Sequence, residues 1–414
     1  MDHIVVIKGG RLIDGNGGPP LDNSLVWIKN QAIEVVGRAE STRFPKEAEV
    51  VDGTGLTVMP GLIDAHVHLI GIKSMNPLTW VIEPPGLRGM RSVMDVWRLI
   101  DCGFTTVRDC ANPNSFYLKG AIEEGSIIGP RIVCCGAMIT QTGGHGDVAH
   151  FLPVEWLHHR GIARIADGVD ECRKAAREQL REGADFLKLS STGGVMSEKD
   201  LPTSSQYSME EIRAIVDEAR NVGIKTASHA QGTRGIKNAL LAGVDTIEHG
   251  FYLDDDAIEM MVKQGSFLTP TLSIVEAIVT KGARAGVPEV SLKKARSVQE
   301  AQHRSFEKAC KAGVRIACGT DYLSDPFMGP MGENAIELEL MVKAGRSPMD
   351  VIVSATKVNA EALGLDSKLG TLEPGKLADL IVVRGDPSKN ISLLRDRANV
   401  VSIYKGGIKM PRLP

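Results

Sequence analysis

The feature that most limits how this chain can fold is a repeated unit, a short apolar run followed by a helical pattern. Eight such runs lie in the middle of the chain: VMPGLIDAHVH, FTTVRD, RIVCCGA, DFLKLS, IKTASHA, VDTIEHG, SFLTPTL and RIACGTD. Eight alternating units predict an α/β fold with parallel strands, and they favour a closed (β/α)8 TIM-like barrel over residues 58–365. The alternative is an open doubly wound sheet, but no GxGxxG or GxxxxGK[ST] follows an early run.

The helical pattern is clearest in SMEEIRAIVDEARNVG. Ser208 and Glu211 predict a capping box at its start, and Gly223 predicts its end. The longest connections between units, 142–170 and 271–295, are expected as loops that cover the strand ends.

Both ends of the chain differ from the middle, because glycines separate short runs rich in Val and Ile. IVVIKGGRLIDGNGG and NSLVWIKNQAIEVVG begin the chain, and ADLIVVRGD and VVSIYKGGIKM lie near its end. Such runs predict short antiparallel strands. We expect residues 1–57 and 366–414 to form one composite β-sandwich domain, since the two ends of a domain usually lie close together.

Two histidines end the first apolar run and are two residues apart. Because side chains at i and i+2 share one face of a strand, His66 and His68 can reach one metal ion together. Asp64 shares their face and would either orient an imidazole or cap the loop. Chemistry in such barrels takes place at the C-terminal ends of the strands. Four more side chains at or near those ends complete a predicted metal site: Lys188, His229, His249 and Asp321.

Lys188 would point into the barrel, where a bare cation is costly. The lysine either pairs with an Asp or Glu of a neighbouring strand, or reacts with CO₂ to give N6-carboxylysine, an anion that can bridge two divalent ions. The four histidines and the aspartate expected around it favour the carbamate.

Glycine-rich segments supply candidates for substrate contacts. His145 stands in TGGHGD and could polarise a substrate carbonyl, or be an ordinary surface histidine. Gly194 and Val195, in GGV after Lys188, could offer backbone N–H groups to a substrate carboxylate, or form a plain turn. No GxSxG, HExxH or cysteine hydrolase motif is present, which favours a metal-bound water as the nucleophile.

Together these motifs resemble the amidohydrolase superfamily, in its binuclear branch with a carboxylated lysine. PGLIDAHVH is similar to the signature of its first strand, and GTLEPGKLADLIVV to the segment that leaves the barrel. The resemblance implies that His66, His68 and Asp321 bind the more buried ion. It also implies that Lys188 bridges and that His229 and His249 hold the second ion.

Within that superfamily, GGHGD, KLSSTGGVMS, SHAQG and TIEHG resemble the prolidase-like dipeptidase and carboxypeptidase group. In that group a histidine like His145 contacts the scissile carbonyl. Several members have a tyrosine for the substrate carboxylate where this chain has Gln231, so Xaa-Pro specificity is not implied. Arg234 is close enough in sequence to replace that contact.

We therefore expect a metal-dependent amide hydrolase that releases a C-terminal amino acid from dipeptides, Xaa-Pro or other, or from N-acyl amino acids. Two divalent ions, Zn²⁺ by expectation, would share the attacking hydroxide. Asp321 would pass its proton to the leaving nitrogen, and His145 would stabilise the oxyanion. The alternatives are a mononuclear deaminase or imidazolonepropionase-like cyclic-amide hydrolase, which needs no bridging lysine, and a non-catalytic scaffold that keeps the fold.

Composition narrows the partners and the location. A net charge of −3 gives no basic surface for nucleic acid or an anionic membrane. Seven cysteines without a CxxC pair are typical of reduced thiols, and no apolar stretch has the length of a membrane span. The N-terminal residues are too polar for a secretory signal. We expect a cytoplasmic homo-oligomer that acts on a small molecule or dipeptide.

Overall fold

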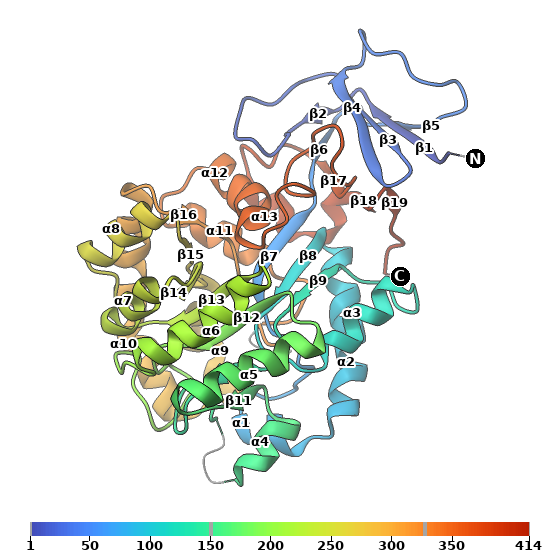
Figure 1. Cartoon of the computed structure of the whole chain (residues 1–414). Coiled ribbons are helices and arrows are strands. Elements are labelled where there is room, and N and C mark those ends of the chain that lie inside the picture. Colours follow the sequence, from blue (N-terminus) through green and yellow to red (C-terminus); the bar gives the residue numbers. More distant parts are fainter. Residues whose placement is uncertain (1, 149–151, 326–328, 414) are drawn as a thin grey trace.

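In the computed structural model, which describes residues 2–148, 152–325 and 329–413, each of the eight predicted runs contains a strand. Figure 1 shows these strands in the centre of the molecule. Their bounds are β7 (Leu62–Val67), β8 (Phe104–Asp109), β9 (Arg131–Cys134), β12 (Phe186–Ser190), β13 (Lys225–Ala230), β14 (Thr246–His249), β15 (Phe267–Thr269) and β16 (Arg315–Ile316).

The strands are parallel, but they do not form one closed sheet. β7, β8 and β9 form a three-stranded sheet, and a second sheet has the order β11-β10-β12-β13-β14-β15-β16. It includes two short strands that the sequence did not predict separately, β10 (Met138–Thr140) and β11 (Ala163–Ile165). The expected closed barrel is therefore interrupted between β9 and β12 and between β16 and β7.

Isolated contacts cross both interruptions. The Asp185 N–H donates to the Cys134 carbonyl at 2.8 Å on one side, and the Asp321 N–H donates to the His66 carbonyl at 2.7 Å on the other. The hydrogen-bond ladder is interrupted between β9 and β12 because the chain bends after β9, and β10 rather than β9 pairs with β12. It is interrupted between β16 and β7 because β16 has only two residues.

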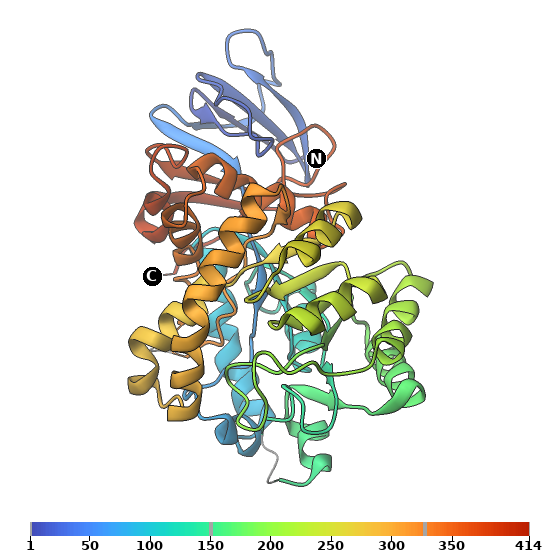
Figure 2. The ribbon, with the colours of Figure 1, turned by 90° about the vertical axis from the view of Figure 1, so that its left-hand side faces the viewer.

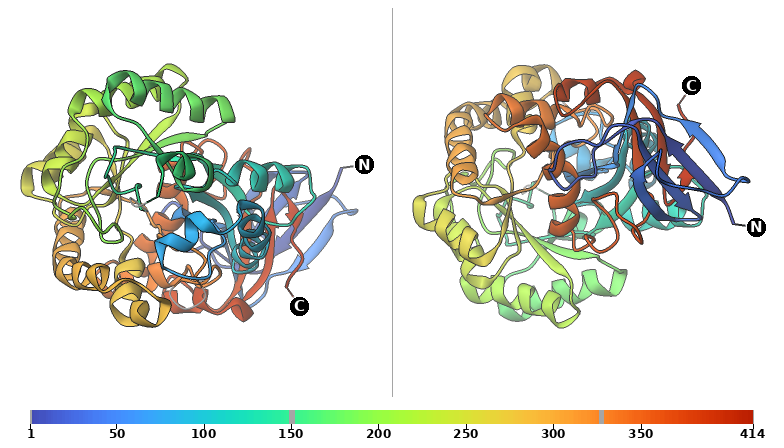
Figure 3. Two further views of the ribbon diagram at one scale, coloured as in Figure 1. Left: turned by 90° about the horizontal axis from the view of Figure 1, so that it is seen from below. Right: turned by 90° about the horizontal axis from the view of Figure 1, so that it is seen from above.

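Helices surround the strands (Figure 3). The predicted capping box at Ser208 and Glu211 is present at the start of α6, and the helix ends just before Gly223. Segment 271–295, expected as a loop, is mostly helical, and 142–170 contains β11 and a short helix, with 149–151 outside the described residues. The helices are α1 (Pro77–Ile82), α2 (Pro85–Asp101), α3 (Ser115–Glu123), α4 (Val154–Arg160), α5 (Gly168–Glu182), α6 (Met209–Asn221), α7 (Thr233–Ala242), α8 (Asp255–Gln264), α9 (Leu272–Ala285), α10 (Glu289–Lys311), α11 (Ile336–Lys343), α12 (Pro348–Val353), the π-helix Ser354–Val358 and α13 (Asn359–Ala362).

The two ends of the chain build two further sheets. One has the order β4-β3-β1-β5, and the other has the order β19-β18-β17-β6-β2 and combines strands from both ends. Val5 and Val26 of the first sheet share a buried cluster with Val58 and Val382 of the second. The strands are β1 (Ile4–Lys8), β2 (Arg11–Leu12), β3 (Ser24–Lys29), β4 (Ala32–Arg38), β5 (Glu49–Asp52), β6 (Leu56–Pro60), β17 (Leu380–Arg384), β18 (Val400–Lys405) and β19 (Ile408–Lys409), with the 3-10 turns Ile391–Arg395 and Arg397–Asn399 before β18.

These sheets lie at one end of the molecule, and α1 and α4 lie at the other (Figures 1 and 2). The expected domain boundary at 57/58 runs through β6, which leads directly into β7. The C-terminal ends of the central strands therefore face away from the terminal sheets. Among the residues that the structure describes, no helix combines the length and the apolar character needed to cross a bilayer.

Candidate active site

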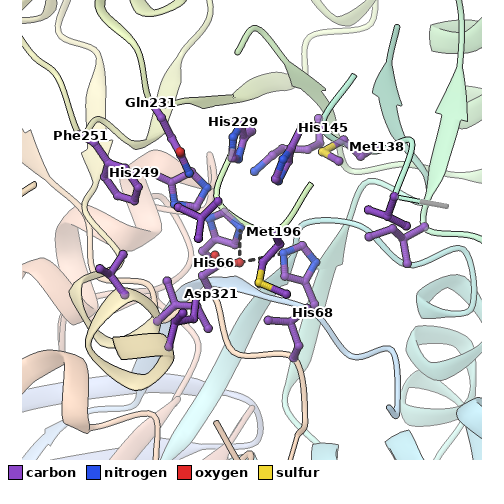
Figure 4. Close-up of a pocket in the computed structure, with 18 of the residues that line it drawn as sticks. His66, His68, Met138, His145, Met196, His229, Gln231, His249, Phe251 and Asp321 are labelled. Carbon is purple, nitrogen blue, oxygen red and sulfur yellow. Dashed lines mark ion pairs between the residues drawn. The ribbon is translucent and has the colours of Figure 1, made fainter. Parts of the chain in front are cut away.

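The six predicted metal-binding side chains line one pocket at the C-terminal ends of the central strands. Figure 4 shows the four histidines and Asp321 among them. The six residues come from five strand ends, as the alternating pattern of the sequence predicted. Three of the expected substrate contacts line the same pocket: His145, Val195 and Gln231. The structure thus brings together nine of the predicted residues: these three with His66, His68, Lys188, His229, His249 and Asp321.

The carboxylate of Asp321 lies at the centre of this group. Its Oδ1 is 2.9 Å from Nε2 of His68 and 3.3 Å from Nε2 of His66. His66, His249 and Asp321 offer donor atoms that all lie within 4.8 Å of one another. Nδ1 of His68 is buried and has no hydrogen-bond partner among the described residues. Imidazole and carboxylate donors converging in this way fit a divalent first-row ion.

Three of the imidazoles are oriented by a hydrogen bond at one ring nitrogen. Nδ1 of His66 is 2.7 Å from Glu248 Oε2, Nδ1 of His249 is 2.8 Å from Thr271 Oγ1, and Nε2 of His229 is 3.0 Å from the Gly193 carbonyl. Metal-binding histidines in proteins are held in this manner, with the other nitrogen free for the ion. The nitrogens that remain are Nε2 of His66 and His249 and Nδ1 of His229.

The partner of His66 belongs to a buried network that the sequence analysis missed. Glu248 accepts a hydrogen bond from Nη2 of Arg108 at 2.6 Å, and Arg108 also donates to the Ala65 carbonyl at 2.6 Å. Burial alone would raise the pKa of Glu248, but the charge of Arg108, then that of Lys188 and the hydrogen bond from His66, hold this pKa well below its ordinary value. Arg108 and Glu248 lie in the strand-like runs FTTVRD and TIEHG, and a charged residue within such a run was the sequence feature that could have predicted them.

Burial keeps three of the candidate histidine ligands neutral. It lowers the pKa of His66 to about 4, with a further contribution from the charge of Lys188. It also lowers the pKa values of His229 and His249 well below that of free histidine. Burial would raise the pKa of Asp321, but the neighbouring histidines outweigh it and hold that pKa below its ordinary value. Neutral imidazoles and an ionised carboxylate are the forms that bind metal.

Two of these side chains reach the pocket through an unusual backbone conformation. His249 has φ of 75° and Asp321 has φ of 58°, in the left-handed region that residues other than glycine seldom adopt. Glu248 already points into the barrel, so strict alternation would point His249 outward. The positive φ turns the side chain of His249 back into the site, and such strain is often found at functional sites.

Lys188 is 2% exposed and lines the pocket, as its position in β12 predicted. Glu248 is paired with Arg108, and no ion pair within the described parts of the chain involves Lys188. The alternative of an ordinary salt bridge with a neighbouring strand therefore has no support in this structure.

Asp64 supports the backbone of the site. One oxygen accepts from the His66 N–H at 3.0 Å, and the other accepts from the Thr320 hydroxyl at 2.8 Å and the Asn334 amide at 2.8 Å. Burial raises the pKa of Asp64 to about 6, although these hydrogen bonds lower it. Its bonds hold the loops together, so the structure favours the loop-capping alternative over contact with an imidazole ring.

Two expected substrate contacts have other surroundings. The N–H of Gly194 donates to Asp200 at 3.2 Å, so it is not available to a substrate carboxylate in this structure. Arg234 is exposed in the first turn of α7 and does not line the pocket, because Gly232 turns the chain away after β13. Gln231 does line it, with a buried Oε1 that has no partner among the described residues.

Comparison with known proteins identifies the family. The model of the amidohydrolase family matches residues 57–409. This chain belongs to the amidohydrolase family. An ochratoxinase from Aspergillus niger is 33% identical over 98% of this chain and 86% of its own length. These matches support a hydrolase of carbon–nitrogen bonds.

Solved structures extend the comparison. A prolidase complexed with N-methylphosphonate-L-proline is 34% identical with a TM-score of 0.93, and covers 99% of this chain and 100% of its own. A Xaa-Pro dipeptidase with bound methionine is 33% identical with a TM-score of 0.89, over 98% of this chain and 99% of its own. The predicted family resemblance is confirmed.

Proposed function

We propose that this amidohydrolase releases a C-terminal amino acid from N-acyl amino acids or dipeptides, using two divalent metal ions, with Zn²⁺ as the expected metal. The observation that carries the proposal is the convergence of four imidazoles, a lysine and a carboxylate on one pocket. The similarity to the prolidase and to the ochratoxinase supports the same class of bond.

The residues divide into two groups around the proposed ions. His66, His68 and Asp321 would hold the more buried one, His229 and His249 the other, and Lys188, as the carbamate, would bridge them. When bound, the ions would lower the pKa of a water molecule and polarise the substrate carbonyl.

Asp321 would move the proton in this reaction. Its carboxylate accepts the proton of the attacking water at Oδ1 or Oδ2 and returns it to the leaving nitrogen, as general base and then acid. The ring of His145 lies against that of His229, with centroids 3.8 Å apart, and would contact the substrate beside the scissile bond. Gln231 Oε1 is an unused acceptor in the same pocket.

The rest of the pocket indicates the side groups that the substrate carries. Aliphatic, aromatic and thioether side chains form its remaining wall, so we propose that the acyl or N-terminal part is bulky and apolar. These residues are Trp80, Met138, Val148, Ile162, Val195, Met196, Phe251, Ile274, Val275, Ile278 and Leu323.

Replacing the proposed proton carrier tests this function. We expect Asp321→Asn to lower kcat on an N-acyl amino acid by more than tenfold, about 1.4 kcal/mol, because the amide cannot accept the proton. Circular dichroism and Tm should show a folded chain. A variant that keeps more than about a tenth of wild-type kcat would contradict the role of Asp321.

Metal content separates the proposal from its alternatives. Elemental analysis should find two ions per chain in the wild type and fewer in Lys188→Ala. One ion per chain, with no amide hydrolysis, would instead favour a mononuclear deaminase or an imidazolonepropionase-like cyclic-amide hydrolase. No bound metal after gentle purification would favour a scaffold.

A further inference from the structure

A row of large apolar side chains is exposed on the outer face of α2, and the function proposed above does not use it. Leu87, Met90 and Met94 are 45%, 76% and 41% exposed. Their spacing of three and four residues places them on one side of the helix, opposite the buried Val96 and Leu99. Figure 1 shows α2 at the outer edge of the molecule, where it contacts α3. Apolar side chains exposed together in this way mark interaction surfaces.

Two glycines lie in the first turns of the same helix. Gly86 and Gly89 are helical, although glycine is the least favourable residue inside a helix after proline. A Cβ on either glycine would meet no atom from elsewhere in the described chain within 4 Å. Packing within the chain therefore does not require them. Bulky side chains next to missing ones fit another helix that approaches closely.

The charges around this row are already neutralised within the chain. Arg91 lies 2.7 Å from Glu83, and Arg98 lies 3.4 Å from Asp95. An anionic membrane attracts clusters of unpaired basic residues, so this face does not match one. The matching surface is apolar and carries opposite charges at its two ends. The face has these properties itself, because Glu83 precedes the row and Arg98 follows it.

We propose that a second copy of this chain covers the outer face of α2, with the two α2 helices antiparallel about a two-fold axis at Met90. In a two-fold contact, each residue pair occurs twice with the two copies exchanged. An axis at Met90 places Met90 against its counterpart and Met94 of each copy over Gly86 of the other. The same register brings Arg98 of each copy to Glu83 of the other, so that unlike charges face each other.

The helices next to α2 complete the area that a stable contact needs. α2 has 17 residues, so it is about 25 Å long, and one face about 10 Å wide covers about 250 Å². A specific interface takes about 800 Å² from each partner. Ile82 on α1, Tyr117 on α3 and Trp156 on α4 are 46%, 76% and 44% exposed, and α1 contacts α4. These neighbouring helices therefore extend the apolar surface around α2.

The contact also supports the wall of the pocket, a step that rests on the function proposed above. α1 has six residues and leads directly into α2. Trp80 on α1 is buried and lines the pocket, whereas Ile82 at its end is exposed. A second copy that covers Ile82 holds this short helix, and with it Trp80, in place.

Sedimentation velocity of the metal-loaded chain tests the contact without a substrate. We expect an even number of chains per particle in the wild type. Met90→Lys should raise the dissociation constant of the pair by about 100-fold or more, because two ammonium groups would meet at the axis. Val262→Lys, at a position on α8 that is 46% exposed, is the matched control and should leave the assembly unchanged.

Two further variants test the register. Met90→Cys should form a disulfide between copies on mild oxidation, since Met90 faces its counterpart, and Val262→Cys should not. The native cysteines are buried or half-buried and do not compete. Gly86→Leu should weaken the pair, because it fills the space taken by Met94. In a Met90→Lys background the same change should raise the Tm, since leucine favours a helix more than glycine does.

Three results would overturn the proposal. One is a wild-type chain that stays monomeric at 10 μM or above, roughly the range of micromolar contacts. Another is an assembly that Met90→Lys does not weaken and Met90→Cys does not cross-link. The third is binding of the wild type, but not of Met90→Lys, to vesicles of anionic lipid, which would make a membrane the occupant. If Met90→Lys does not fold, the cross-link decides.

Kinetics test the link to the pocket separately. The monomeric Met90→Lys chain should have a severalfold higher KM for an N-acyl amino acid with a bulky acyl group, and kcat should change less. An unchanged KM would overturn the support of Trp80, and the sedimentation result would still judge the contact. If neither chain hydrolyses the amide, the proposed function fails, whereas the assembly is measured without it.

Discussion

Two buried cationic side chains, Arg108 and Lys294, stabilise the surroundings of the pocket through different kinds of contact. Arg108, at the end of β8, pairs with the carboxylate of Glu248 at 2.6 Å, and Glu248 in turn orients His66. Lys294, on α10, lies 2.5 Å from the carbonyls of both Ser197 and Asp200.

The difference is in what each cation neutralises. Arg108 balances a charged side chain between strands, so it sets the direction of one imidazole. Lys294 gathers main-chain carbonyls, and the Asp200 carboxylate is farther from it, at 3.7 Å. It therefore sets the course of a whole loop. We call Arg108, Glu248 and His66 the strand-borne side of the site, and it depends on a charge pair. We call Lys294 and the loop carbonyls that it contacts the loop-borne side, and it depends on the conformation of the backbone.

The largest expected effect comes from breaking the strand-borne pair. Arg108→Met leaves the charge of Glu248 buried without its partner, which costs about 3–5 kcal/mol. Urea denaturation of the metal-loaded chain measures this loss. The double variant Arg108→Met/Glu248→Leu is the control and should be less destabilised than the single one, because no charge remains unpaired. A single variant as stable as the wild type would contradict the contrast between the two sides.

Metal affinity should follow the strand-borne side alone. Glu248→Gln weakens the acceptor that orients His66, and we expect metal affinity to fall by about 10–100-fold. Competition with a chelator measures it. Removing the metal should also lower the Tm, since an ion at a hundred times its Kd stabilises the folded chain by about 2.7 kcal/mol. If Ser197→Ala lowered metal affinity as much as Glu248→Gln does, the strand-borne and loop-borne sides would not act separately on the metal site.

The loop-borne cation should matter less for stability. Lys294→Met keeps the apolar stem and removes the ammonium, so we expect a loss of about 1.5 kcal/mol in the free energy of unfolding. Activity should fall more than stability suggests, because Ser197 and Gln206 of this loop contact His145. Lys293→Met, at the exposed neighbouring position, is the matched control. A loss as large as that of Arg108→Met would remove the distinction.

The smallest effect is expected at the apolar wall, which neither cation touches. Ile278→Ala should lower kcat/KM for a substrate with a bulky acyl group, a loss of about 1 kcal/mol in transition-state stabilisation. It should leave kcat/KM unchanged for a substrate with a small acyl group. Val279→Ala, on the same helix but outside the pocket, should change neither rate. Equal losses on bulky and small substrates would contradict the apolar subsite.

The sequence predicted the strands and their order, because the hydrophobic periodicity of each run and the glycines or polar residues that end it are visible in short segments. It predicted the convergence of His66, His68 and Asp321 for the same reason, since parallel strands bring their C-terminal ends together. Lys188 was predicted as a site residue because it is a charged side chain within an apolar strand. The same reasoning applied to Arg108 and Glu248 would have found the second charge pair, but only the structure shows that the two meet.

Other features depend on tertiary contacts that no local pattern contains. The segment expected as a loop at 271–295 is held as a helix partly because Glu337 accepts from the N–H groups of Leu272 and Ser273, at 2.9 and 2.7 Å. The positive φ of His249 is likewise imposed from outside, since intrinsic preference opposes it. The hydrogen bonds around Asp200 are formed within a loop of irregular conformation, residues 191–206, which sequence periodicity does not describe.

The sheet that joins the two ends of the chain has a consequence for the order of folding. Leu380 of β17 pairs with Pro60 of β6, so β6 cannot be completed until almost the entire polypeptide has been synthesised. Contacts so distant in sequence form slowly. The central strands can therefore assemble while one edge of β6, which also pairs with β2, is still open, and the pairing of β6 with β17 closes this aggregation-prone edge late.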